Sequence, residues 1–189
     1  SILKGLSDLA VRFPQIKEID INPLIIQPDG KPVAVDALIV TGKHLPAPVK
    51  REEVNRATLR SCYYPQSVVF VGASGTISKW GHMIPTNILN RNYKGKVYLV
   101  NPKGGQIVGQ TAYRSVTEID GDIDLAVVTI PAAKVKAQIP LLQQKKVKAM
   151  LLISSGFRET GEEGRKLEDE VVAAARGAGI LIFGPNTMG

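Results

Sequence analysis

The sequence predicts an α/β fold in which helices cover both faces of a parallel β-sheet. Strongly apolar segments, typical of buried strands, recur near residues 67–72, 96–100, 124–130, 147–153 and 179–183. Helical patterns lie between them, near residues 81–92, 132–144 and 162–177. Strands that alternate with helices pair in parallel through right-handed crossovers, and buried parallel strands are apolar on both faces. The predicted arrangement is therefore Rossmann-like.

A phosphate-binding loop is predicted at the end of the first of these strands. The apolar run 67–71 stops at a glycine, and small residues follow before the next helix. Backbone amides of such a loop, together with a helix N-terminus, can hold a diphosphate. A strand-to-helix turn without a ligand is the alternative, and the GxGxxG spacing of NAD and FAD sites is absent. The candidate cofactor-binding residues here are Gly72, Ala73, Ser74, Gly75 and Lys79.

The second strand leads to a lysine, where a dinucleotide-binding protein usually has an acid for the ribose hydroxyls. The candidate residues are Asn101, Pro102 and Lys103. A lysine suits a ligand that is phosphorylated on its ribose, because it supplies a positive point charge. CoA and NADP meet this description, and NAD does not. A solvated loop lysine is the alternative interpretation.

Two further strand ends carry candidate cofactor-binding residues. Pro131 follows the third strand, where proline also suits the first turn of a helix. Ser154 and Ser155 follow the fourth strand and precede Gly156 and Phe157. The serines serve either a ligand or the backbone of their own loop. Because the carboxyl ends of parallel strands lie along one edge of a sheet, all of these residues are expected to contribute to one site.

The chain is predicted to contain a small first unit, residues 1–41, a linker over 42–58, and the main domain over 59–189. In the first unit a helix precedes two strands, 18–26 and 33–40. One helix and two strands are too few for an independent core. The first unit is therefore expected to be the end of a preceding domain.

The composition is typical of a soluble cytoplasmic protein. The chain has 189 residues, a net charge of +7 and one cysteine. No apolar run reaches the roughly 18 residues of a membrane helix, and a single cysteine fits a reducing compartment. The basic residues are scattered and only 5% of residues are aromatic, so neither a membrane nor a nucleic acid is expected as a partner. Because the sequence lacks an initiating methionine, it is expected to be part of a longer polypeptide.

Several motifs occur in a fixed order along the main domain: Pro65-Gln66-Ser67-Val68, Val71-Gly72-Ala73-Ser74, Asn101-Pro102-Lys103, Asp124-Leu125-Ala126-Val127, Ile153-Ser154-Ser155-Gly156-Phe157 and Gly184-Pro185-Asn186. With these motifs, residues 59–189 resemble the CoA-binding domain of the NDP-forming acyl-CoA synthetases, which are related to succinyl-CoA synthetase. The resemblance implies that CoA is the ligand of the predicted site.

The first unit has an asparagine before a proline on one strand, Asn22, and an aspartate near the start of the next, Asp36. In this it resembles the C-terminal end of the ATP-grasp domain of the same synthetases, where the matching residues hold the Mg²⁺ of the nucleotide. Oxygen atoms on neighbouring antiparallel strands suit such a hard cation. A turn residue and a surface acid are the alternative interpretation.

The resemblance implies a reversible reaction in which an acid, CoA and ATP give acyl-CoA, ADP and phosphate. In the family, a histidine of a domain that follows the CoA-binding one carries the phosphoryl group, and neither His44 nor His82 matches it. The chain alone is therefore expected to bind CoA and to catalyse nothing. Its expected partners are CoA, a carboxylic acid and the remaining domains of the enzyme, with homo-oligomerisation left open. Thr187 stands where the family often has cysteine.

Two other functions fit the same loops. Lys103 also suits the NADP of a Rossmann oxidoreductase module, although no general acid or base accompanies the glycine loop. The second alternative is a non-catalytic module that senses acyl-CoA or nucleotides.

Overall fold

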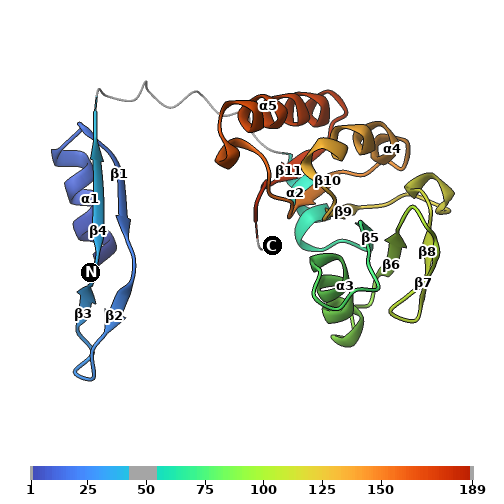
Figure 1. The fold of residues 1–189 in the computed structure, drawn as a ribbon, viewed down its shortest axis with the longest axis horizontal. Coiled ribbons are helices and arrows are strands. Elements are labelled where there is room, and N and C mark those ends of the chain that lie inside the picture. The colour runs from blue at the N-terminus through green and yellow to red at the C-terminus, as the bar shows by residue number, and fades with distance from the viewer. Residues whose placement is uncertain (1, 43–54, 188–189) are drawn as a thin grey trace. The chain divides into compact units, whose positions relative to one another are not determined.

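A computed structural model describes residues 2–42 and 55–187. The chain forms two compact units, Ser1–Glu53 and Val54–Gly189 (Figure 1). Most of the predicted linker, 42–58, lies outside the described residues.

The first unit consists of one helix and two short antiparallel strand pairs. Its elements are α1 (Ile2–Arg12), β1 (Ile16–Ile21), β2 (Leu24–Ile26), β3 (Pro32–Ala34) and β4 (Ala37–Thr41). β1 pairs with β4, and β2 pairs with β3. The prediction of two unbroken strands is wrong, because both are interrupted at facing positions. At this break the amide of Asn22 donates to the carbonyl of Asp36 at 3.2 Å, and that of Val35 donates to the carbonyl of Pro23 at 3.1 Å.

The described part of the first unit, residues 2–42, contains no buried core. None of residues 2–42 is buried, and large apolar side chains on its strands, among them Ile25, Ile26 and Leu38, are about half exposed or more. This agrees with the expectation that one helix and a few short strands bury too little apolar surface to fold independently.

The second unit is built on a seven-stranded sheet. Its strands are β5 (Ser67–Val71), β6 (Lys96–Val100), β7 (Gly105–Ile107), β8 (Gln110–Tyr113), β9 (Leu125–Val128), β10 (Ala149–Leu152) and β11 (Leu181–Phe183). Its α-helices are α2 (Arg56–Tyr63), α3 (Trp80–Asn90), α4 (Ile139–Gln144) and α5 (Glu162–Gly177). The strand order is β11-β10-β9-β5-β6-β8-β7, and every neighbouring pair is parallel except β7 with β8. The predicted α/β fold with a mainly parallel sheet is confirmed.

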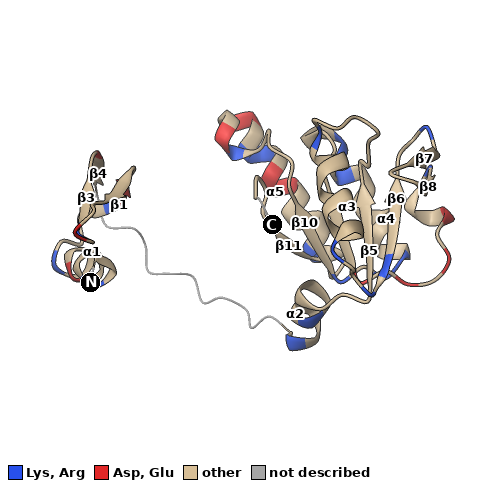
Figure 2. Ribbon diagram, turned by 90° about the horizontal axis from the view of Figure 1, so that it is seen from below, with Lys and Arg blue, Asp and Glu red and all other residues tan. Residues whose placement is uncertain are grey.

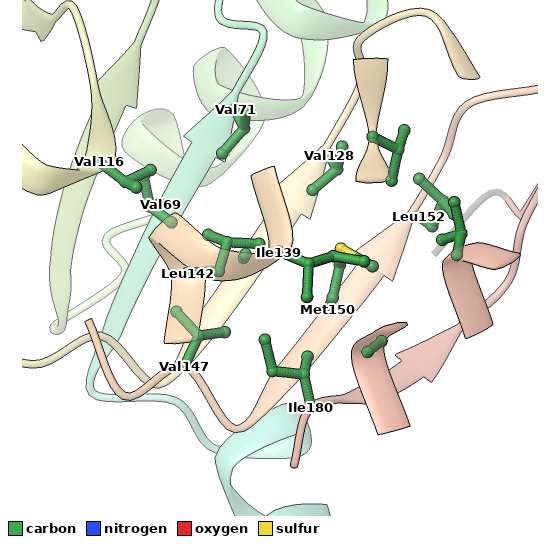
Figure 3. Close-up of a cluster of buried hydrophobic side chains, with 14 of the residues drawn as sticks. Val69, Val71, Val116, Val128, Ile139, Leu142, Val147, Met150, Leu152 and Ile180 are labelled. Atoms are coloured by element: carbon green, nitrogen blue, oxygen red, sulfur yellow. The ribbon is translucent and has the colours of Figure 1, made fainter. Parts of the chain in front are cut away.

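The central strands are apolar on both faces because helices cover both. All residues of β5 and of β9 are buried. Alternate residues of β5 point to opposite sides of the sheet: Val69 belongs to one buried cluster and Phe70 to the other. The first cluster is closed by α4 and α5, through Leu142 and Val171 among others, and is shown in Figure 3. The second is closed by α2 and α3, where Ile84 packs against it.

Two parts of the second unit differ from the prediction. The helix expected over 132–144 is a pair of 3₁₀ turns, Ala132–Lys134 and Lys136–Gln138, followed by the short α4. Pro140 lies in the first turn of α4, where its missing amide is tolerated. The β7–β8 hairpin is not predicted, because strands of three and four residues carry too little periodicity to be recognised.

The charged residues of the second unit are distributed over many elements and do not gather on one face (Figure 2). This matches the scattered basic residues of the sequence. Among the described residues, no helix is both long and apolar enough to cross a membrane.

Candidate functional site

A groove of about 400 Å³ lies at the carboxyl ends of the parallel strands. From β5 the chain continues to β6 on one side, while β9 lies on the other side. In open parallel sheets, ligands bind in the crevice at such a reversal of strand order. We call it the strand-end groove. Its lining residues are Lys79, Trp80, Thr129, Ile130, Pro131, Ile153, Ser154, Ser155 and Asn186.

The glycine loop after β5 is held tightly by its own backbone. The amides of Gly72 and Ala73 both donate to the carbonyl of Val100 at 3.0 Å, and that of Ser74 donates to the carbonyl of Gly81 at 2.9 Å. The expectation that these three amides are free for a phosphate is therefore wrong. They fix the shape of the loop.

The N-terminus of α3 places positive charge at the edge of the groove. Lys79 is its N-cap residue, and no side chain caps the helix there. The first amides of a helix carry a partial positive charge that favours anions, and the ammonium of Lys79 adds to it. Because Lys79 and Trp80 both line the strand-end groove, this charge faces the groove.

Asn101 anchors the turn after β6 to the glycine loop. Its side-chain amide donates to the carbonyl of Ala73 at 2.7 Å, while its oxygen accepts from the amide of Lys103 at 2.8 Å. Asn101 therefore holds the glycine loop and the turn after β6 in position relative to each other. Pro102 and Lys103 are exposed beside it.

We expect Asn101→Asp to destabilise the second unit by about 2 kcal/mol. The carboxylate still accepts from Lys103 but places an oxygen against the carbonyl of Ala73, which loses its donor. Urea unfolding measures the loss. Asn87→Asp, on the exposed face of α3, is the control and is expected to stay within about 0.5 kcal/mol of wild type. An equal loss in both variants would contradict the anchoring role.

Ser154 and Thr129 tie neighbouring strand ends together beneath the groove. The hydroxyl of Ser154 donates to the carbonyl of Ile130 at 2.5 Å, and the carbonyl of Ser154 accepts from the amide of Asn186 at 3.0 Å. The hydroxyl of Thr129 donates to the carbonyl of Gly72 at 3.3 Å. Both predicted serines line the groove, but Ser154 is half-buried and its hydroxyl bonds to backbone, whereas Ser155 is exposed.

The loop after Ser155 begins with Gly156, whose φ of +99° favours glycine. The amide of Gly156 donates to Glu159 Oε1 at 2.6 Å. This hydrogen bond lowers the pKa of the Glu159 carboxyl. Because the folded-state pKa lies below the unfolded one, the ionised form stabilises the loop above the ordinary pKa, and this is lost as the pH falls through the lowered value.

The prediction that Phe157 contacts the cofactor is wrong for its side chain. The ring is fully buried and belongs to the core beneath the groove. An aromatic residue close to a strand end fits both a ligand site and a core, and burial decides for the core.

Comparisons with known proteins agree with this geometry. Residues 66–189 match a CoA-binding domain, and residues 1–41 match an ATP-grasp domain. Over 188 residues, all of this chain, it is 38% identical to the ADP-forming acetate–CoA ligase II of Archaeoglobus fulgidus. The chain belongs to the family of ADP-forming acetyl-CoA ligases. It covers 27% of that relative and 29% of the alpha subunit of ADP-forming acetate–CoA ligase I of Pyrococcus furiosus, to which it is 43% identical over 136 residues.

A solved member of the ligase family has the same fold. It is the dinucleotide-forming acetyl-coenzyme A synthetase 1 of Ca. Korarchaeum cryptofilum, in complex with phosphate and ADP. The match has a TM-score of 0.66 and 36% sequence identity, and it covers 69% of this chain and 28% of the synthetase.

In the ATP-grasp segment of this ligase-family chain, the main chains of the two predicted metal ligands lie opposite each other. Asn22 and Asp36 meet at the break between the strand pairs through a backbone hydrogen bond, and both are exposed. Asp36 Oδ1 also accepts from the amide of Ala37 at 2.8 Å. Among residues 2–42 and 55–187, no three His, Cys, Asp or Glu side chains cluster as a metal site. Amide and carboxylate oxygens are ligand types that Mg²⁺ accepts beside water or phosphate, and the metal site at Asn22 and Asp36 stays a prediction.

Sequence reasoning misses five residues that line the groove of this ligase-family domain, namely Trp80, Thr129, Ile130, Ile153 and Asn186. Trp80 opens α3, and Asn186 follows the last strand, β11. Asn186 stands out in the sequence only as part of a motif. The signal for Trp80 is its place beside Lys79 at a helix start, where a large aromatic residue has no helix-capping role.

Proposed function

We propose that this chain provides the CoA-binding domain and the end of the ATP-grasp domain of an ADP-forming acyl-CoA ligase. The enzyme would interconvert an acid, CoA and ATP with acyl-CoA, ADP and phosphate. The observation that carries the proposal is the strand-end groove, which lies at the reversal of strand order in a domain of the CoA-binding family. The groove combines a cationic helix start with walls of mixed apolar and polar side chains, which suits a ligand with a diphosphate and a long, uncharged arm that carries amide groups.

The proposed ligand spans three parts of the sheet edge. Lys103, in the turn after β6, would pair with the ribose phosphate of CoA as a point charge. Gly75, Lys79 and the N-terminus of α3 would hold the diphosphate. The pantetheine arm would follow the strand-end groove past Pro131 and Ser155, toward the ends of β9 and β10.

The histidine chemistry is proposed to lie outside this chain. His82 is the histidine of the described residues, and its Nδ1 lies 3.1 Å from the carbonyl of Ser74. Because a carbonyl only accepts, Nδ1 carries the proton and the ring supports the glycine loop. Since His82 does not match the family's phosphorylated position, a phosphoryl-carrying histidine would come from another domain, and the chain alone would be inactive.

The remaining domains of the enzyme are the proposed partners of the first unit. Another domain is proposed to pack against the exposed apolar side chains of its strands, because large apolar patches on soluble domains mark interaction surfaces. Asn22 and Asp36 would hold the Mg²⁺ of ATP, which shields phosphate charge during phosphoryl transfer. A carboxylic acid is the proposed second substrate.

Calorimetric titration of the chain with CoA, dephospho-CoA and NADPH tests this function. We expect CoA to bind more tightly than dephospho-CoA, and Lys103→Ala to weaken CoA by about 3- to 10-fold while leaving dephospho-CoA unchanged. Lys96→Ala is the matched control, because Lys96 is an exposed lysine at the opposite, amino end of β6.

The outcomes separate the candidate functions. Binding of NADPH without CoA would favour an oxidoreductase module and contradict the ligase. An equal loss of CoA affinity in Lys103→Ala and Lys96→Ala would show that Lys103 acts only through net charge. Tight binding of CoA by a full-length protein without ligase activity would favour a sensing module.

A further inference from the structure

The loop between β10 and α5 is held by two carboxylates, one from Glu159 within the loop and one from Glu168 on α5. Glu159 Oε1 accepts from the amide of Gly156 at 2.6 Å. Glu168 Oε2 accepts from the amide of Arg158 at 3.2 Å, and its Oε1 accepts from Arg158 Nε at 2.7 Å. Hydrogen bonds to an ionised acceptor are about twice as strong as neutral ones. Two nearby main-chain amides are therefore fixed by charge.

Glu168 is the buried member of this pair. Its side chain is 12% exposed, and Arg158 covers it from the solvent side. Because a buried carboxylate needs a partner, the pair fixes the 3₁₀ turn Arg158–Thr160 on α5. Glu159 lies in that turn, so its main chain is held in a fixed position.

Gly156 is the part of the loop that most needs an external restraint. A glycine has more backbone freedom than any other residue, and its φ here is +99°. Its neighbour Ser155 lines the strand-end groove. Ser154 is fixed separately, through Ile130 and Asn186. Glu159 thus restrains the peptide that presents Ser155 to the groove.

We infer that Glu159, supported by Glu168, is a positioning residue for the ligand in the strand-end groove. Its carboxylate fixes the Ser155–Gly156 peptide, which forms one wall of the groove, and it acts through Gly156. The inference rests on the proposed binding of CoA. Since Glu159 is exposed, its removal leaves the core intact and releases only this wall.

The wall is expected to matter for one part of the ligand only. The nucleotide end of CoA is proposed to bind at Lys103 and at the start of α3, and no contact between it and Ser155 is proposed. The pantetheine arm follows the groove. A nucleotide without the arm, 3′,5′-ADP, is therefore expected to be insensitive to Glu159, whereas CoA is sensitive.

The test compares Glu159→Ala, Glu159→Gln and Glu163→Ala in the whole chain. Glutamine keeps an acceptor for the amide of Gly156, and Glu163 is an exposed acid at the start of α5. We expect Glu159→Ala to weaken CoA by about 3- to 10-fold and to leave 3′,5′-ADP unchanged, with Glu159→Gln recovering most of the loss. Glu163→Ala should match wild type, and hydrogen exchange at Gly156 should speed up only in Glu159→Ala.

Several results would overturn the inference. Equal weakening of CoA and 3′,5′-ADP would show a general structural or charge effect, and unchanged CoA binding in Glu159→Ala would show that the wall is not used. Failure of glutamine to recover affinity, together with a loss in Glu163→Ala, would assign the effect to net charge. If the wild-type chain binds neither CoA nor 3′,5′-ADP, the proposed function fails and the inference falls with it.

Discussion

Gly81→Ala is expected to destabilise the second unit by about 3–5 kcal/mol, among the largest effects of any single substitution in this chain. A Cβ at Gly81 would overlap the carbonyl oxygen of Gly72, at a separation well inside the 3.0 Å that real Cβ atoms keep. Both partners are constrained, since Gly81 accepts from the amide of Ser74 and Gly72 donates to Val100. The start of α3 would have to move away from the sheet, and the groove would open with it.

Thermal unfolding by circular dichroism measures this effect. We expect a melting temperature lower by roughly 10–20 °C and a weaker CoA affinity, because the loop and helix that hold the diphosphate separate. Gly75→Ala is the matched control for the melting temperature only: it lies in the same loop, has no positive φ, and an added Cβ there meets no atom within 4 Å. A wild-type melting temperature in Gly81→Ala would contradict the close packing of α3 on the loop.

Gly164→Ala is expected to cost a similar amount, about 3–5 kcal/mol, on the other side of the groove. Gly164 is buried in the first turn of α5, and a Cβ there would overlap the carbonyl oxygen of Phe157 and the hydroxyl of Thr160. That carbonyl already accepts from the amide of Thr160 at 2.8 Å, so it cannot turn away without breaking the 3₁₀ turn.

Gly177→Ala, at the other end of α5, is the control for this prediction. An added Cβ at Gly177 meets no atom within 4 Å, and alanine is the better helix former. We expect stability equal to wild type or up to about 1 kcal/mol higher. Urea unfolding separates the two variants, and equal stability of Gly164→Ala and Gly177→Ala would contradict the packing of α5 on the loop.

The parallel sheet is predictable from the sequence because its central strands are apolar on both faces and alternate with helices. The interruptions are not predictable in this way. The strands around Asn22 and Asp36 are interrupted at facing positions, although the two segments stay paired in the same register on both sides, and no periodicity signals this break. The β7–β8 hairpin is too short to show a pattern. The apolar spacing predicts one helix over 132–144, whereas Pro140 lies in the first turn of the shorter α4.

The site is predictable as an edge of the sheet but not as a set of contacts. Pro131 and Ser155 are expected at strand ends, and they line the groove. Phe157 resembles a ligand contact by its position, but it is buried. The amides of Gly72 and Ala73 are expected to be available, but they bond to β6. Whether an amide or a side chain is free for a ligand depends on which segment of the fold lies opposite it, and the sequence alone does not show this.

Chemical-shift mapping of the isotopically labelled chain during titration with CoA is the most direct test of the central claim. If CoA binds at the strand-end edge, amide shifts should concentrate at Gly75, Lys79 and Lys103, and along the groove at Trp80 and Ser155. Shifts confined to α2 or to the amino ends of the strands, or no shifts at saturating CoA, would contradict it.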